Sequence, residues 1–149
     1  MERSKPQIKT IPKVRDPAKP TDHRQATGKQ GETIASCYLF ELGYELIARN
    51  VRTRNGELDI ICADDHTLVV VEVKCARVHR PARPQLDPLE SINARKRLRV
   101  RSLTSALLAG QPPDVLPDRH FAAVRFDAIG VTLDRTGQLL KLDHVKSAF

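Results

Sequence analysis

The chain has 149 residues, 40% of them hydrophobic, and a net charge of +7 at pH 7. This length suits one domain with its own core, and because tryptophan is absent and aromatic residues make up only 4%, that core must be mainly aliphatic. No apolar run approaches the ~20 residues of a membrane helix, and the basic N-terminus lacks the apolar segment of a secretory signal.

Cysteine usage is sparse. Three thiols stand at positions 37, 62 and 75, without the paired spacing of a zinc site. We expect them to be reduced and buried, which is typical of a cytoplasmic protein.

Positive charge is concentrated in two stretches of the sequence. Residues 1–30 hold eight Lys or Arg against three Asp or Glu, and residues 77–101 hold eight against two. A basic patch indicates a polyanionic partner such as DNA, although a solvated helix face carries the same charges, and the sequence leaves both interpretations open. Residues 1–26 also contain several prolines and lack apolar periodicity, so they are predicted to form a disordered tail before a domain spanning 27–149.

The domain is expected to open with a helix. Thr27 and Gln30 have the spacing of a capping box, and apolar residues follow at helical intervals until Gly43 ends the pattern. Glu32 flanks the apolar stripe of this helix. It could reach an acidic site, or it could simply stabilise the first turn.

Residues 44–51 favour a first strand or an extended entry to the following strands. Arg52 and Arg54 come next, and they could contact phosphate or pair with nearby acids. Two apolar runs follow, at 58–63 and 68–73, and the short polar turn between them favours a β-hairpin. The second run is apolar on both faces. That pattern is typical of a central strand covered on both sides in an α/β domain.

Four charged residues stand in or beside these runs, where burial is costly unless charges pair or bind a metal: Glu57, Asp59, Glu72 and Lys74. Because side chains alternate along a strand, a turn with an even number of residues would place all four on one face. The opposite face would then carry the apolar residues Leu58, Ile60, Val71 and Val73. The excess negative charge would attract a divalent cation, Mg²⁺ or Mn²⁺.

The second basic stretch is predicted to form a helix. Asp87, Pro88 and Glu90 make a strong helix start, and the apolar spacing continues to about Ala109. Lys96 falls on the apolar stripe, where it could point to the acidic site or to a phosphate, or snorkel from the edge. The exposed sides of the helix carry Arg95, Arg97, Arg99 and Arg101.

Two further strands are predicted at 124–133 and 139–145, joined by a turn that contains Gly137. Asp127 is an isolated acid in the first of them, and a hydrogen-bonded structural role fits it better than a place in the acidic site. The sequence contains no phosphate-binding glycine loop, nucleophile elbow or internal repeat.

The order of Asp59, Glu72 and Lys74 on adjacent strands indicates a particular chemistry. Two carboxylates can hold Mg²⁺, a hard cation that prefers oxygen ligands, and the ion can activate water and shield a phosphate oxygen. Lys74 can position that water or stabilise charge that develops on the phosphate, and Glu32 can add a carboxylate. These parts suit hydrolysis of a phosphodiester bond.

This D…E-x-K order resembles the PD-(D/E)xK nuclease superfamily, and the chain more closely resembles the YraN-like family of small bacterial proteins. The resemblance covers residues 28–149. Its most specific blocks are Gly56-Glu57-Leu58-Asp59-Ile60-Ile61 and Val71-Glu72-Val73-Lys74, with further matches at Gly31-Glu32, Ala35, Gly43-Tyr44, Asn50, Arg52, Arg54, Lys96, Arg125-Phe126-Asp127 and Ala148-Phe149. It implies a restriction-endonuclease-like fold, in which a central mixed β-sheet is flanked by helices, and similarity to archaeal Holliday-junction resolvases.

On this resemblance the implied catalytic residues are Glu32, Asp59, Glu72 and Lys74, and the three acids are the implied metal ligands. Leu58 replaces the proline of the superfamily. Ala76 stands where the family usually has arginine, and Arg77 follows it, which leaves a phosphate contact there open. The candidates for contact with DNA are Arg52, Arg54, Arg77, Arg95, Lys96, Arg97 and Arg99.

The sequence therefore favours a Mg²⁺-dependent or Mn²⁺-dependent DNA endonuclease that acts on branched or recombining DNA. The alternative is a module that retains the fold and binds nucleic acid or another partner without cutting. A third interpretation is a structural ion-pair cluster in which Lys74 neutralises Glu72. A homodimer would suit an enzyme that cuts both strands, and the sequence leaves the oligomeric state open.

Overall fold

The computed structural model describes residues 23–79 and 87–149. In chain order the elements are α1 (His23–Glu41), β1 (Glu45–Thr53), β2 (Gly56–Asp64), β3 (Thr67–Arg77), the short 3-10 helix η1 (Pro88–Ser91), α2 (Ala94–Leu108), β4 (Ala123–Leu133) and β5 (Leu139–Val145). Most of the predicted tail, up to residue 22, lies outside the described residues.

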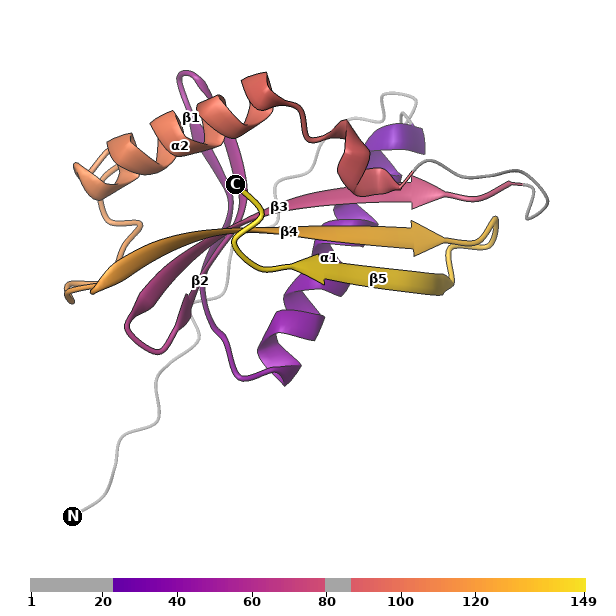
Figure 1. Cartoon of the computed structure of the whole chain (residues 1–149), viewed down its shortest axis with the longest axis horizontal. Helices are drawn as coiled ribbons and strands as arrows, with labels where there is room; N and C mark the ends of the chain where they lie inside the picture. Colours follow the sequence, from indigo (N-terminus) through magenta and orange to yellow (C-terminus); the bar gives the residue numbers. More distant parts are fainter. Residues whose placement is uncertain (1–22, 80–86) are drawn as a thin grey trace, which may run out of the picture.

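The five strands form one sheet in the order β1-β2-β3-β4-β5. Neighbouring strands run antiparallel except β3 and β4, which are parallel, so the sheet is mixed. The parallel pair requires a long crossover, and the chain makes it through η1 and α2 (Figure 1). The predicted α/β class, with a central mixed sheet flanked by helices, is confirmed.

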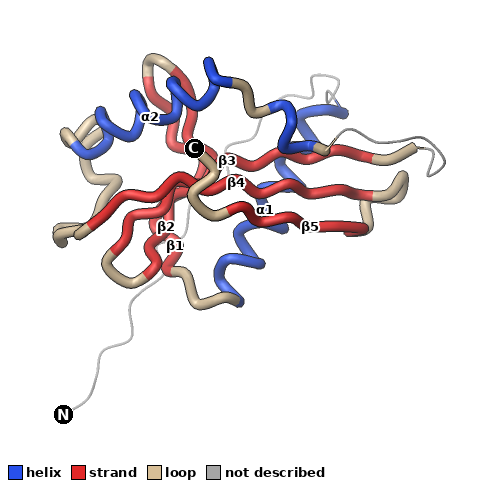
Figure 2. The backbone as a smooth tube through the Cα atoms, in the orientation of Figure 1, coloured by secondary structure: helices blue, strands red, loops and turns tan. Residues whose placement is uncertain are grey.

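The two long helices cover opposite faces of the sheet (Figures 1 and 2). Alternate residues of β3 divide between two apolar cores, because successive side chains of a strand point to opposite faces. Val69 and Val71 pack with the α1 residues Ala35 and Leu39. The other face of β3 packs with α2 through Leu68, Val70, Val100, Leu103 and Leu107. The predicted central strand is therefore confirmed, and both cores are mainly aliphatic.

Helix α1 begins at His23, earlier than the capping pattern predicted. Thr27 donates its hydroxyl to the His23 carbonyl at 2.9 Å, one turn back, so it lies inside the helix. Gln30 instead reaches the turn between β4 and β5, donating to the Gly137 carbonyl at 2.7 Å. The capping-box prediction is wrong because α1 already includes Thr27 and because Gln30 bonds a distant carbonyl instead of the helix start. Gly43 closes the helix as expected, with a φ of 88° that suits glycine.

The hairpin of β2 and β3 has a two-residue turn, since Asp64 pairs with Thr67. This even turn gives the register that the sequence analysis required. The prediction that Leu58 and Ile60 share a face is wrong, because Leu58 packs on the α2 side and Ile60 on the α1 side. Alternation breaks between them at Asp59, where the pairing of β2 with β3 has ended at Ile60.

The predicted single helix from Asp87 to about Ala109 is also wrong, because the segment is divided into η1 and α2. Asp87 caps only the short 3-10 helix, by accepting from the Leu89 N–H at 2.9 Å. Asn93 then caps α2, accepting from the Lys96 N–H at 3.0 Å. An asparagine side chain that bonds a nearby N–H competes with a continuing helix, and here it starts a new one.

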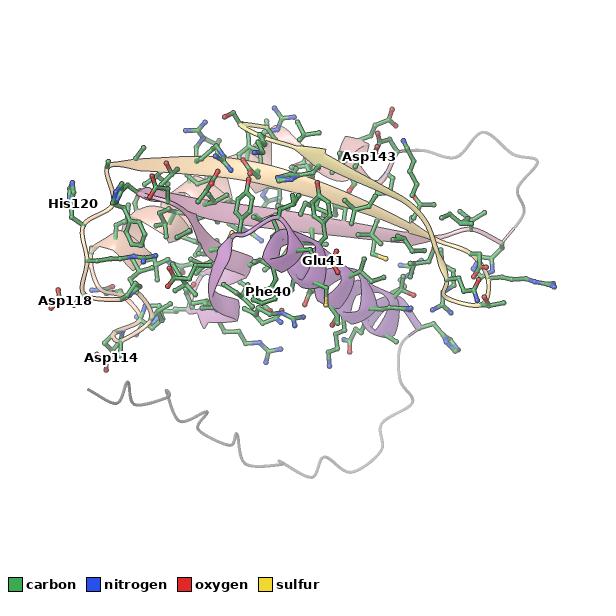
Figure 3. The ribbon with its side chains drawn as sticks, turned by 90° about the horizontal axis from the view of Figure 1, so that it is seen from below. Phe40, Glu41, Asp114, Asp118, His120 and Asp143 are labelled. Carbon is green, nitrogen blue, oxygen red and sulfur yellow. The ribbon has the colours of Figure 1, made fainter. Side chains whose placement is uncertain are left out.

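Several side chains lie on the surface outside both cores. Figure 3 shows Phe40 and Glu41 at the C-terminal end of α1, with Asp114, Asp118 and His120 in the loop between α2 and β4. Cys37 is free and exposed, which corrects the expectation that all three thiols are buried; Cys62 is buried and Cys75 half-buried. In the described part of the chain, no helix is both long and apolar enough to span a membrane.

Candidate functional site

Asp59 and Glu72 come together at the point where β2 separates from β3. The last strand pair between them joins Ile60 to Val71, so these two acids occupy the next position of the register. The Asp59 side chain continues the contact between β2 and β3, because its Oδ2 accepts a hydrogen bond from the Val73 N–H at 2.8 Å. The chain thus places two acids side by side on neighbouring strands, as the hairpin pattern predicted.

Glu72 is buried, with only 2% of its side chain exposed, and it is paired with two lysines. Its Oε1 lies 3.2 Å from Lys74 Nζ and 2.9 Å from Lys96 Nζ. The interpretation that Lys96 points to the acidic site is therefore confirmed. A buried carboxylate needs such partners, because an unpaired charge away from water is strongly unfavourable.

Asp59 has an unusual tendency to hold a proton. Burial and the neighbouring Glu72 charge raise the pKa of Asp59 from 3.8 to about 7, with a smaller contribution from Glu32. The Val73 hydrogen bond and the Lys96 charge act in the opposite direction and do not overcome these effects. A carboxyl group with a strongly shifted pKa beside a second acid is a feature of functional sites. A nearby cation would lower that pKa again, because it stabilises the ionised form.

Glu32 approaches this pair from α1. It is close enough for its charge to raise the pKa of Asp59, and its Oε2 is buried without a hydrogen-bond partner in the described chain. Across residues 23–79 and 87–149, however, no three His, Cys, Asp or Glu side chains form a group that could hold a metal ion as they stand. The structure therefore joins Asp59, Glu72 and Lys74 closely, with Glu32 beside them.

The donor atoms fit a hard divalent cation in their chemistry. Asp59 and Glu72 offer carboxylate oxygens, and the unpartnered Oε2 of Glu32 is a third acceptor whose burial calls for a positive partner. Mg²⁺ or Mn²⁺ would be held by Asp59 and Glu72, with Glu32 as the outer carboxylate. A metal would have to displace Lys74 and Lys96 from Glu72 or share the Glu72 carboxylate with them.

Glu57 does not join the acid pair, contrary to the prediction that four charges share one face. It pairs with its strand neighbour Arg52, at 3.5 Å between Arg52 Nε and Glu57 Oε2, and the arginine side chain is 82% exposed. The same break in alternation at Asp59 that separates Leu58 from Ile60 explains why Glu57 points away from Glu72.

Comparison with known proteins gives a consistent result. The model of a family described as "Uncharacterised protein family UPF0102" matches residues 31–131. The UPF0102 proteins of Acidothermus cellulolyticus and Herpetosiphon aurantiacus are each 40% identical to the chain over 130 and 128 residues, covering 85% of the chain and 95% of each relative. The UPF0102 protein of Desulforamulus reducens is 38% identical over 128 residues, covering 84% and 96%. The chain belongs to the UPF0102 family. The YraN-like resemblance is thereby confirmed.

The arginines predicted to contact DNA have varied surroundings in this UPF0102 chain. Arg54 lies exposed at the turn between β1 and β2, whereas Arg77 donates to the Gln30 side chain at 3.1 Å. On α2, Arg95 and Arg99 are exposed. Arg97 donates to the Ile92 carbonyl at 3.2 Å and lies over the Phe149 ring. Their contact with DNA stays a prediction.

Asp127 is the structural acid that the sequence analysis favoured. It is fully buried beside β5, accepting hydrogen bonds from Arg125 at 2.9 Å and from the Ser147 N–H at 3.0 Å, with His144 Nε2 at 3.0 Å. Burial alone would raise the pKa of Asp127, but the bonds from Arg125, Ser147 and His144 outweigh it and lower that pKa. Asp127 therefore belongs to a separate network in the UPF0102 fold.

Sequence reasoning missed three residues that lie near Glu32. Gly28, Lys29 and Arg49 line one cavity with it, between α1 and β1. Arg49 fell within the residues interpreted as a first strand or an extended entry, and Gly28 and Lys29 fell within the predicted first helix. The signal available for Gly28 was its place inside a helix, where glycine is unfavourable.

Proposed function

We propose that this UPF0102 protein is a metal-dependent endonuclease that hydrolyses phosphodiester bonds in DNA. The observation that carries the proposal is the adjacent pair of half-buried Asp59 and buried Glu72, with Lys74 bound to Glu72, at the point where two central strands part. Two acids and a lysine held on rigid strands are the groups that such a reaction needs.

Each residue has a distinct task in the proposed reaction. Asp59 and Glu72 would hold the cation, and the Val73 hydrogen bond fixes the Asp59 carboxylate beside its neighbour. Lys74, whose side chain is 32% exposed, can reach both Glu72 and a substrate, where its ammonium group stabilises charge on the phosphate. When bound, Mg²⁺ supplies Lewis-acid chemistry and neutralises phosphate charge.

The test is cleavage of linear, supercoiled and four-way-junction DNA by the purified chain with Mg²⁺ or Mn²⁺. We expect Asp59→Ala and Lys74→Ala to lower the rate by about 10²-fold or more, since each removes a group that acts on the reacting phosphate. Lys141→Gln on β5 removes a surface charge that pairs with Asp143, and it serves as the matched control. Absence of cleavage, or equal cleavage by wild type and the two site variants, would refute the proposal.

The second candidate function is a nucleic-acid-binding module without cleavage. It is favoured by one observation, which is that Lys74 and Lys96 together neutralise Glu72 without any metal. Salt-sensitive DNA binding that survives Glu72→Ala, combined with no cleavage of any substrate, would support this function instead. Comparison of four-way junctions with linear duplex in the same assay decides whether branched DNA is preferred.

A further inference from the structure

A cavity of about 850 Å³ opens between the N-terminal half of α1 and strand β1. Its lining includes Gly28, Lys29 and Glu32 from α1 and Arg49 and Arg52 from β1. Glu57 lines it from β2, two residues before Asp59, so the cavity extends to the strand that carries one acid of the pair. The cavity therefore adjoins the site of the proposed reaction.

Two residues that line this cavity each carry a buried polar atom without a hydrogen-bond partner in the described chain. One atom is Nε of Arg49, a donor, and the other is Oε2 of Glu32, an acceptor. Within residues 23–79 and 87–149, the hydrogen bond of the Arg49 side chain is a long one, from its terminal nitrogen to the Thr33 hydroxyl at 3.3 Å. Buried groups of this kind are normally hydrogen-bonded, and leaving them unpaired is unfavourable. A phosphate and its accompanying cation would satisfy both, since the phosphate accepts from Arg49 and the cation faces Glu32.

Gly28 supplies an independent observation. It lies inside α1, where glycine is less favourable than alanine. A Cβ built on Gly28 would meet no atom of the described chain within 4 Å, so neither packing nor a special backbone angle requires glycine. Because Gly28 lines the cavity, the missing side chain leaves the helix backbone open to close approach from outside.

We propose that this cavity holds the phosphodiester backbone of the DNA strand, with Lys29 and Arg49 bonded to phosphate oxygens and Gly28 allowing the strand to approach α1. This inference rests on the proposed function and names the surface that presents DNA to it. It places the main phosphate contacts on the α1 side of the sheet, away from the α2 arginines. On α2, Arg97 and Arg101 lie over the Phe149 and Phe126 rings.

The first experiment adds a charge to the cavity without disturbing the fold. Gly28→Glu and Gly28→Gln fill the same open space, so the difference between them isolates charge. Binding of a fluorescein-labelled duplex and of a labelled four-way junction is followed by anisotropy, with Ca²⁺ in place of Mg²⁺ to prevent cleavage. We expect Gly28→Glu to bind at least ~10-fold more weakly than Gly28→Gln, because an added carboxylate repels phosphate. Thermal melting of both variants verifies that they fold.

The second experiment removes cations singly. Arg49→Gln and Lys29→Gln should each lower the slope of log Kobs against log[salt] by about 0.9, the value for one lost phosphate contact on duplex DNA. Lys141→Gln, on the opposite edge strand β5, should leave the slope unchanged. Arg95→Gln and Arg99→Gln on α2 should have smaller effects than Arg49→Gln.

The outcomes separate this inference from the proposed function. In one outcome the wild type binds or cuts DNA, Gly28→Glu binds DNA as tightly as Gly28→Gln, and the Arg95 and Arg99 variants lose DNA affinity. The DNA surface then lies on α2. The inference then fails, and the nuclease proposal stands. If the cavity variants lose binding as expected but no variant or wild type cuts, the inference stands and the nuclease proposal fails. If the wild type neither binds nor cuts any DNA, both fail.

Discussion

The backbone N–H of Val73 bonds the Asp59 carboxylate at 2.8 Å, from the strand position between Glu72 and Lys74. One side chain of β2 is thereby fixed to the backbone of β3 just beyond the last strand pair, Ile60 with Val71. The spacing of the acid pair is consequently set by the hairpin backbone. A site built on paired strands holds its geometry better than one built on loops.

We expect Asp59→Asn to change how stability depends on pH. In the folded chain the pKa of Asp59 is about 7, raised by burial and by Glu72, against 3.8 when unperturbed. Between pH 3.8 and about 7, Asp59 is therefore protonated in the folded state and ionised in the unfolded state. The stabilisation by this proton is complete below pH 3.8 and is lost as pH rises toward and through 7. The asparagine variant should lack this decline and melt higher than the wild type above pH 7.

Thermal melting of both proteins from pH 5 to pH 9, without divalent cations, measures this effect. Parallel curves for wild type and variant would contradict the raised pKa.

Mg²⁺ should also raise the melting temperature of the wild type above pH 7, and Glu72→Ala should abolish that rise, because a ligand that binds only the folded state stabilises it.

Lys96→Met should have opposite effects on stability and on metal binding. Removing one of two lysines from the buried Glu72 carboxylate should lower the free energy of unfolding by about 1–3 kcal/mol. The same change removes a competing cation, so Mg²⁺ should stabilise the variant more than it stabilises the wild type. Urea unfolding with and without Mg²⁺ gives both quantities. A smaller Mg²⁺ effect in the variant would instead show that Lys96 supports the metal site.

Two glycines of α1 should respond oppositely to alanine. At Gly31 an added Cβ would collide with Cys75, coming within 2.9 Å of its Sγ, because the helix lies directly on β3 there. Gly31→Ala should therefore cost about 1–3 kcal/mol of stability despite the better helix propensity. At Gly28 the space is open, and Gly28→Ala should stabilise by about 0.5–1 kcal/mol. Urea denaturation of the two variants compares these values, and equal shifts would exclude the tight contact.

Asp127→Asn should be strongly destabilising. The carboxylate is fully buried, accepts hydrogen bonds from Arg125 and the Ser147 N–H, and lies beside His144. Its loss leaves these donors without a charged acceptor. We expect a loss of about 3–5 kcal/mol at pH 7. Because the folded pKa of Asp127 is lowered, its contribution is present above 3.8 and declines as pH falls below that value. Asp143→Asn, which breaks only the partly exposed pair with Lys141, should cost less than about 1 kcal/mol by the same denaturation assay.

The sequence was most informative where local rules decide the structure. Alternating side chains and an even turn allowed Asp59 to lie opposite Val70 or Glu72, and the two-residue turn of the structure fixes the register that puts it beside Glu72. The place of Lys96 on an apolar stripe left open whether it points to the acidic site, to a phosphate or to solvent, and the structure pairs it with Glu72. The place of Glu32 beside the apolar stripe of its helix left two roles open, at the acidic site or in the first helical turn, and the family resemblance implied the first.

Other features depended on tertiary structure and could not be read from the chain. The break in alternation at Asp59, which separates Glu57 from the acid pair, follows from β2 leaving β3 while it still pairs with β1. Gln30 is recruited by the distant Gly137 carbonyl, so its apparent capping role was misleading. The cavity joining Gly28 to Arg49 needs the packing of α1 on β1, which periodicity does not specify.

The parallel pairing of β3 with β4 has a consequence for the order of folding. Each of its pairs joins residues 56 positions apart, such as Thr67 and Ala123, whereas the β2–β3 hairpin joins Ile60 to Val71. Closing the longer loop costs more chain entropy, so the three N-terminal strands should form first and the crossover should dock later. The acids would then be adjacent before α2 brings Lys96 to cover them, and the last folding step would be the one that encloses the charge.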